Sequence, residues 1–270
     1  MEKFISLADD IVKVWSKSGS LYLKGALSTM ELALFATLAG CIIGLFCGII
    51  QTIPVSKEDN IAKKTAVTLA KAIVRIYVEV FRGTPMILQS VFIFFALPYF
   101  TDNAVRFELT TAAYLIVSIN TGAYMAETVR GGIFSIDKGQ TEGAMAIGMN
   151  HFQTMLYVIL PQTVKNIIPQ IGNNLIINIK DTSVMFIIGF TELFAVHKGV
   201  VGANYLYFPS ATIEMGMYLA MTVICSLLLR LWEKKLAGSG SFDIATTDTL
   251  AHTSGMIHYT EKKNHETEGR

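Results

Sequence analysis

Charge is scarce in this chain: only 16% of its 270 residues are Asp, Glu, Lys or Arg, whereas 52% are apolar. Soluble domains are about one-quarter charged, so this composition excludes an ordinary soluble domain and predicts several membrane-spanning helices. The net charge of +1 lacks the excess of basic residues that nucleic-acid binding requires, and we expect no nucleic-acid partner.

Residues that carry chemistry are also few. The three cysteines, Cys41, Cys47 and Cys225, lie in apolar stretches and form no CxxC pair, and the histidines show no metal-ligand spacing. This excludes the usual thiol redox and zinc motifs. The sequence contains no GxxxxGK[ST] motif, so the chain cannot cradle ATP phosphates in a P-loop. We therefore expect no metal, no cofactor and no catalytic activity in this chain.

Long apolar stretches are what the sequence does contain. They predict an all-α membrane protein with about five transmembrane helices, near residues 26–53, 85–100, 111–133, 152–179 and 209–232. Gly40, Gly44 and Gly48 recur at four-residue spacing on one face of the first span. Small residues in this pattern allow two helix backbones to approach closely in lipid.

Three regions are expected along the chain. Residues 1–24 are predicted to form an amphipathic N-terminal segment on the membrane surface. Residues 25–235 make up the transmembrane domain. Residues 236–270 are polar and follow a Gly/Ser linker, so we predict a disordered tail.

Residues 57–82 are apolar enough to span a membrane but carry a stripe of basic residues within a narrow helical arc: Lys57, Lys64, Lys71, Arg75 and Arg82. A basic stripe on an apolar helix is typical of a helix that lies in the anionic cytoplasmic interface. We therefore predict an interfacial helix here. A tilted additional span remains the alternative.

Two of the expected spans carry polar stripes at helical spacing. Asn120, Tyr124 and Glu127 share a face of the third span, and the fourth span carries Gln162, Asn166 and Asn173. Polar groups at membrane depth are costly and normally face a cavity or a partner helix. These six residues are our candidates for lining a solute pathway. Hydrogen bonds that only hold helices together are the alternative, and for Glu127 so is a local pair with Arg130.

A short helix is expected between these two spans, within the sequence GQTEGAMAIGMNHFQTMLYVILPQ at residues 139–162. Asp137 can cap its first turn, and Gly148 can end it because glycine tolerates the left-handed conformation. Asn150 and Gln153 form a capping box for the helix that follows. The small residues Gly143, Ala144 and Ala146 predict a low surface against which another protein can pack.

The pattern of Glu142, Gly143, Ala144, Gly148 and then Leu160-Pro161 resembles the EAA loop of ABC-transporter permeases, E-A-A-x3-G-x9-I-x-L-P. It differs where Gly143 replaces the usual Ala and Val158 the usual Ile. The phrases FRGTPMILQ and AYMAETVRGGIFSIDKGQ resemble permeases of the His/Glu/Gln/Arg/opine-type amino-acid importers. The resemblance extends over about residues 20–235.

This resemblance implies the permease subunit of an ATP-driven amino-acid importer with the type I ABC importer permease fold. Glu142, Gly143, Ala144 and Gly148 would belong to a coupling helix that docks on a separate ATPase. The implied partners are ABC ATPase subunits, a second permease copy or a sister permease, an extracytoplasmic solute-binding protein, an amino-acid solute and membrane lipid. The implied location is the bacterial inner membrane.

Placing the EAA-like loop inside puts the N-terminus outside and the C-terminus in the cytoplasm. The basic residues of 57–82 and those at the end of the last span then agree with the positive-inside rule: Arg230, Lys234 and Lys235. Four lysines of the outer N-terminal segment count against it: Lys3, Lys13, Lys17 and Lys24.

Other functions remain as alternatives. One is an ABC permease for another small polar solute. Another is a secondary transporter, but the sequence shows neither inverted repeats nor an ion-coupling pair. A membrane enzyme would need clustered catalytic residues, and the Ser, His and acidic positions here are dispersed.

Overall fold

The computed structural model describes residues 2–56 and 59–236, and all regular elements in these ranges are helical. The all-α prediction is confirmed. The elements are α1 (Glu2–Thr52), α2 (Ile61–Gly83), α3 (Met86–Val91), η1 (Phe92–Ala96), α4 (Leu97–Phe100), α5 (Leu109–Phe134), α6 (Lys138–Ala146), α7 (His151–Thr154), η2 (Met155–Ile159), α8 (Leu160–Asp181), η3 (Thr182–Ile188), α9 (Leu193–Asn204) and α10 (Tyr207–Leu236). Lys57 and residues 237–270 of the expected tail lie outside the described residues.

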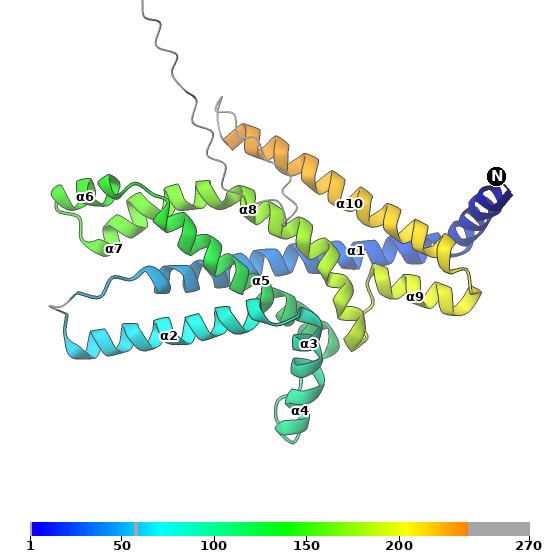
Figure 1. The fold of residues 1–270 in the computed structure, drawn as a ribbon, viewed down its shortest axis with the longest axis horizontal. Helices are drawn as coiled ribbons and strands as arrows, with labels where there is room; N and C mark the ends of the chain where they lie inside the picture. Colours follow the sequence, from blue (N-terminus) through cyan, green and yellow to red (C-terminus); the bar gives the residue numbers. More distant parts are fainter. Residues whose placement is uncertain (1, 57–58, 237–270) are drawn as a thin grey trace, which may run out of the picture.

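Helix α1 runs along the whole length of an elongated bundle (Figure 1). Its 51 residues correspond to about 75 Å at 1.5 Å per residue. The expected N-terminal segment therefore continues into the first span as one helix. The N-terminus and α9 lie at one end of the bundle, whereas α6 lies at the other end, where α1 finishes and α2 begins (Figure 1).

Helix α5 packs against α1 through the predicted glycine stripe. Three glycines of α1 face three residues of α5 that have the same four-residue spacing: Gly40 faces Thr121, Gly44 faces Met125 and Gly48 faces Val129. A Cβ at Gly44 would lie 2.7 Å from the Met125 carbonyl carbon, closer than real Cβ atoms approach. The backbones therefore meet at a distance that only glycine permits, which confirms the prediction of close approach.

Helix α5 also makes close contact with α8. A Cβ at Gly132 would lie 2.6 Å from Ile167 and 3.1 Å from Thr163. Much of α5 is buried, including Ala112, Ile116 and Ala126. Helix α5 is therefore the central helix of the bundle.

Two helical segments, Ser6–Thr52 and Tyr207–Glu233, are long and apolar enough to cross a membrane, and two bent pairs of helices raise the number of candidate spans to four. The pairs are Ile61–Gly83 with Met86–Phe100 and His151–Ile188 with Leu193–Asn204. Helix α5 is not among these four. Because one face of α5 is buried against α1 along the glycine stripe, we infer that α5 lies at the same membrane depth as α1.

Two π-helical turns interrupt the helices. Each ends two residues before a proline: η1 precedes Pro98 and η2 precedes Pro161. A proline ring clashes with the carbonyl four residues earlier and offers no N–H. The wider π turn relieves this clash before Pro161, whereas Pro169 lies within the continuous helix α8.

Helix α2 stands alongside α1 and runs antiparallel to its C-terminal part (Figure 1). Val74 and Val78 of α2 are buried and pack against Ala126 of α5, with Cys47 and Ile50 of α1 beside them. The opposite face of α2 exposes large apolar side chains: Leu69, Ile73, Ile76 and Val80. A helix that lies along a transmembrane helix with its apolar face outward favours the additional-span alternative over a helix that lies flat in the interface.

The glycine contact gives a direct stability prediction. We expect Gly44→Ala to lower the unfolding free energy by about 1–3 kcal/mol, because its Cβ collides with α5. The matched control is Gly216→Ala in α10, where an added Cβ meets nothing within 4 Å and alanine's higher helix propensity stabilises by up to about 1 kcal/mol. Thermal unfolding of the purified variants measures both. Equal melting temperatures for the two variants would contradict the packing.

Candidate coupling helix and solute pathway

Helix α6 begins and ends with defined caps. Asp137 accepts a hydrogen bond from the Gly139 backbone N–H at 2.6 Å and begins the helix, as predicted. At the other end Gly148 has φ +88°. Its N–H donates to Met145 O at 2.9 Å, and the next residue's N–H donates to Ala144 O at 3.1 Å, which is a Schellman motif. Both predicted ends of this helix are confirmed.

The predicted capping box at the start of α7 is also present. The Gln153 N–H donates to Asn150 Oδ1 and the Asn150 N–H donates to Gln153 Oε1, each at 2.9 Å. Gln140 occupies the corresponding position of α6, and its side chain accepts a hydrogen bond from Gln162 Nε2 of α8 at 3.3 Å. Gln162 thus lies next to α6, at the end of α8, and ties the two helices together.

The surface of α6 is partly as predicted. Glu142, Gly143 and Gly148 are exposed, and an added Cβ at Gly143 would meet nothing within 4 Å. Ile147 beside them is 80% exposed. Ala144, in contrast, is only 5% exposed. Ala144 is therefore not part of the exposed surface predicted from the sequence. It packs α6 against the rest of this chain.

On α5, the candidate residues lie beside α2. Asn120 Nδ2 donates to Gln89 Oε1 at 3.0 Å and to Phe81 O at 3.3 Å, which ties α5 to the α2–α3 turn. Tyr124 is 43% exposed, and the Arg82 guanidinium lies 5.5 Å from its ring centroid. These contacts place Asn120 in a helix-joining role and leave the Tyr124 ring accessible.

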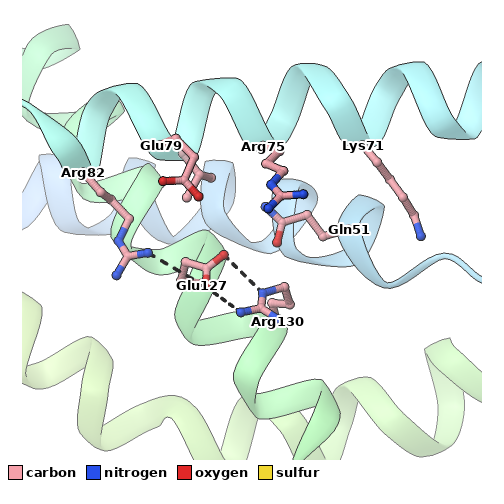
Figure 2. Close-up of a pocket in the computed structure, with 8 residues that line it drawn as sticks. Gln51, Lys71, Arg75, Glu79, Arg82, Glu127 and Arg130 are labelled. Atoms are coloured by element: carbon pink, nitrogen blue, oxygen red, sulfur yellow. Dashed lines mark hydrogen bonds and ion pairs between the residues drawn. The ribbon is translucent and has the colours of Figure 1, made fainter.

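Glu127 pairs with two arginines (Figure 2). Its carboxylate lies 2.7 Å from Arg130 Nη2 and 3.9 Å from Arg82 Nη1. The local Glu127–Arg130 pair that the sequence offered as an alternative is therefore present. Arg82 of α2 is an additional partner, so that the charges of α2 and α5 meet at this carboxylate.

On α8, exposed and buried amides separate cleanly. Asn166 and Asn173 are exposed, and Gln162 is half-buried. Asn178 is buried: its Nδ2 donates to Thr37 Oγ1 of α1 at 2.8 Å, and its Oδ1 accepts from Thr121 Oγ1 of α5 at 3.1 Å. The buried amide joins three helices, whereas the exposed amides remain available to another molecule.

The candidate polar residues of α5 and α8, which are exposed or half-buried, share one side of this helix pair. On α5, Thr121 and Met125 mark the buried line that faces the neighbouring helices. At 100° per residue, Tyr124 and Glu127 lie to one side of this line. Asn166 and Asn173 lie to the corresponding side of the buried α8 line through Thr163 and Asn178. Helices α5 and α8 are antiparallel because α6 and the short segments around it reverse the chain (Figure 1). The polar residues of the two helices therefore lie on the same side of the pair.

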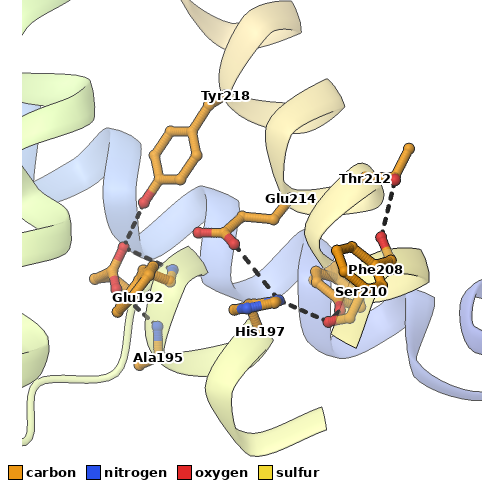
Figure 3. A network of polar contacts seen from close by, with 10 residues as sticks. Glu192, Ala195, His197, Phe208, Ser210, Thr212, Glu214 and Tyr218 are labelled. Atoms are coloured by element: carbon orange, nitrogen blue, oxygen red, sulfur yellow. Dashed lines mark hydrogen bonds and ion pairs between the residues drawn. The ribbon is translucent and has the colours of Figure 1, made fainter. Parts of the chain in front are cut away.

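A buried polar network at the opposite end of the bundle was not predicted (Figure 3). Glu192 is fully buried and accepts hydrogen bonds from backbone N–H groups of α9, including Ala195 at 2.8 Å, from the Tyr218 hydroxyl at 2.8 Å and from Thr29 at 3.3 Å. His197 Nδ1 lies 2.8 Å from Ser210 Oγ and 3.5 Å from Glu214.

These partners come from α1, α9 and α10, so sequence spacing cannot reveal the network. One local signal was present: an acidic residue directly before an apolar helix, as at Glu192, is a helix N-cap pattern. The surrounding donors provide hydrogen bonds to the buried Glu192 carboxylate. The network thereby joins α9 to α1 and α10.

The geometry defines a class of protein: a helical membrane protein with a capped helix at one end and exposed polar groups along the two helices that it joins. Residues 65–237 match the family model of the binding-protein-dependent transport system inner membrane component. The chain belongs to this family.

Relatives agree with this assignment. The chain is 34% identical over 216 residues to the glutamine transport system permease protein GlnP of Escherichia coli (strain K12), a match covering 80% of this chain and 93% of the relative. It is 30% identical over 211 residues to the probable amino-acid permease protein YxeN of Bacillus subtilis (strain 168), covering 78% of this chain and 91% of the relative.

Solved structures show the same fold. The crystal structure of an amino acid ABC transporter with histidines matches with a TM-score of 0.71 and 32% identity, covering 82% of this chain and 96% of that chain. An inward-facing structure of the MetNI methionine ABC transporter matches with a TM-score of 0.64 and covers 82% of this chain and 98% of that chain. At 18% identity this second likeness concerns the fold alone.

The chain is therefore a multi-pass inner-membrane permease component of a binding-protein-dependent amino-acid ABC transport system, as the sequence predicted. It acts in transport and not in catalysis. A system of this kind includes an ATPase and a solute-binding protein as partners.

Proposed function

We propose that this permease imports a polar amino acid. In this proposal α6 docks on an ATPase at one side of the membrane, and its movement displaces α5 and α8, whose polar faces line the solute pathway. The observation that carries this proposal is the direct attachment of α6 to both helices. Only three residues separate α5 from α6, and four separate α6 from α7. A displacement of α6 would therefore reach both helices.

Rigidity at α6 supports its role in coupling. Asp137 and Gly148 fix its ends, Asn150 fixes the start of the next helix, and Gln140 joins it to α8. Glu142 and Gly143 would contact the ATPase. Gly148 would shape the turn, and buried Ala144 would transmit force into the chain that supports it.

The solute pathway is proposed along Asn120, Tyr124 and Glu127 of α5 and along Gln162, Asn166 and Asn173 of α8. Tyr124, Asn166 and Asn173 are exposed, and the other three, which have partners within the chain, would flank them. Exposed polar groups at membrane depth are costly unless a cavity or a partner covers them. A second permease facing this side would provide that cover. Both a second copy of this chain and a sister permease meet this requirement.

The solute is proposed to be a polar amino acid, such as the glutamine named for several relatives. Its ammonium and carboxylate each need a partner at membrane depth, because an unpaired buried charge costs several kcal/mol. Amide and hydroxyl groups can serve both charges with moderate hydrogen bonds. The exposed side chains of the two helices offer such groups.

We propose that α6 faces the cytoplasm and that the N-terminus lies outside. The end of the bundle that carries α6 also carries the first residues of α2, including Lys63 and Lys64 (Figure 1). Arg230 and Lys235 belong to the C-terminal end of α10. Cytoplasmic placement of these basic residues follows the positive-inside rule.

Enlarging the exposed surface of α6 tests the coupling. We expect Gly143→Trp to leave the melting temperature of the permease unchanged, because the site is open in this chain. The same variant should reduce copurification of the ATPase, or reduce uptake per ATP hydrolysed, by about tenfold, since tenfold corresponds to about 1.4 kcal/mol of lost docking. Pull-down and uptake in proteoliposomes measure the two effects.

The matched control is Gly202→Trp in α9, another open, exposed glycine at the far end of the bundle. It should retain the ATPase in full. If Gly143→Trp copurifies with the ATPase and transports at the wild-type rate, α6 is not the docking helix.

Two asparagines of α8 separate pathway lining from helix joining. Asn173→Leu should reduce uptake severalfold and leave the melting temperature unchanged, because Asn173 is exposed. Asn178→Leu should lower the unfolding free energy by about 1–3 kcal/mol, because it leaves buried hydroxyls without their partner. Uptake and thermal unfolding are measured on the same purified complexes. Full transport by Asn173→Leu would remove this residue from the pathway.

A further inference from the structure

A cleft of about 380 Å³ lies between the end of α1, the inner face of α2 and the cytoplasmic half of α5 (Figure 2). Its charged lining consists of Lys71, Arg75, Glu79 and Arg82 from α2 and of Glu127 and Arg130 from α5. This volume is within the range of small-molecule sites, which begins at about 300 Å³. The cleft is therefore large enough for one amino acid.

The lining has more cations than carboxylates. Four basic residues face two acidic ones, and the Glu127 carboxylate is already shared by Arg82 and Arg130. Within residues 2–56 and 59–236, Lys71 and Arg75 form no ion pair. The cleft therefore has an excess of two positive charges. One arises from Arg82 and Arg130, which share Glu127, and the other from Lys71 and Arg75 beside Glu79 on α2.

These cations line the open cleft and lie away from the apolar face of α2. Lys71, Arg75 and Arg82 lie on the helical arc of buried Val78, whereas apolar residues such as Ile76 occupy the opposite, exposed face. A helix that recruited lipid headgroups from the surface would direct its basic side chains outward. Cations that lie between helices and away from lipid normally face a polar cavity or a ligand.

The cleft joins the proposed pathway. Glu127 belongs to both, and Arg82 reaches from the cleft to the exposed ring of Tyr124 at 5.5 Å. A solute that passes Tyr124 would therefore meet the cationic lining within the same open region. The group that such a lining attracts is a carboxylate, which arginine binds through paired hydrogen bonds.

We propose that this cleft binds the carboxylate groups of the transported amino acid, so that the permease itself favours acidic amino acids, accepts neutral ones and disfavours basic ones. This inference rests on the proposed function, because it assumes that the solute passes along α5. Lys71 and Arg75 provide the unpaired positive charge. The phosphate of an anionic lipid carries a negative charge like that of the amino-acid carboxylate. The experiment therefore has to distinguish a bound lipid from a bound amino acid.

The test uses the purified permease–ATPase complex without binding protein, in nanodiscs that contain only phosphatidylcholine. Scintillation proximity measures equilibrium binding of radiolabelled L-glutamate, L-glutamine and L-arginine. We expect glutamate to bind about tenfold more tightly than arginine, with glutamine between them, since like charges oppose binding of the basic solute. Equal affinities, or no measurable binding of any of the three, would overturn the inference.

Variants assign the preference to the cleft. The double change Lys71→Gln with Arg75→Gln should abolish the preference for glutamate, whereas Arg75→Lys, which keeps the charge, should retain it. Lys63→Gln is the matched control, because Lys63 lies on the same helix outside the cleft and pairs with Asp59. Wild-type preference in the double variant would overturn the proposal.

Lipid binding is distinguished by repeating the measurement with phosphatidylglycerol in the nanodiscs. If the double variant loses only copurifying phosphatidylglycerol, and the wild type shows no preference among the three amino acids, the cleft is a lipid site and the inference fails. ATP-driven uptake with loaded binding protein is measured on the same complexes. Intact uptake without any preference would leave the proposed function standing and overturn this inference alone.

Discussion

The close approach of α1 and α5 is the contact on which the rest of the bundle depends. Gly40, Gly44 and Gly48 remove the side chains that would otherwise separate these helices, so α5 lies directly against the longest helix of the chain. With α5 fixed, α2 packs on one flank and α8 on the other, where Gly132 admits Thr163. Dispersion contacts at this short range replace the hydrophobic driving force that is absent between helices in lipid.

This arrangement links the two ends of the proposed mechanism. The same α5 that α1 holds in place runs through a three-residue connection into capped α6, and α8 returns from it. Buried Asn178 joins α8 to α1 and α5, so motion at α6 would shift packed helices as bodies and not as separate side chains. The exposed amides on α8 would move with them. In the proposed mechanism, rigid packing in the interior would transmit the motion of α6, and the exposed polar groups on one side would contact the solute.

Local features were predictable from the sequence. Which face of each helix packs against protein and which remains exposed was not. The glycine stripe, the caps at Asp137, Gly148 and Asn150, and the Glu127–Arg130 pair all follow from spacing within one or two helical turns. Periodicity identified the basic stripe of α2 but could not tell whether it faced headgroups or protein. The same limit explains buried Ala144 and the network at Glu192, because both depend on segments that meet only in the folded bundle.

The central claim is that α2 stands in the membrane with its apolar face outward and its cations in the cleft, and the tilt of α2 can be measured directly. Single nitroxide-labelled cysteines are placed along the exposed apolar face by Leu69→Cys, Ile73→Cys, Ile76→Cys and Val80→Cys, in a background without Cys41, Cys47 and Cys225. Electron paramagnetic resonance measures the membrane depth of each nitroxide from its collisions with oxygen and with a water-soluble nickel complex. The account predicts that the depth increases steadily from Leu69→Cys to Val80→Cys, because the C-terminal end of α2 lies beside Asn120 and Glu127 of α5. Equal depth at all four positions would contradict it, because α2 would then lie flat on the cytoplasmic face.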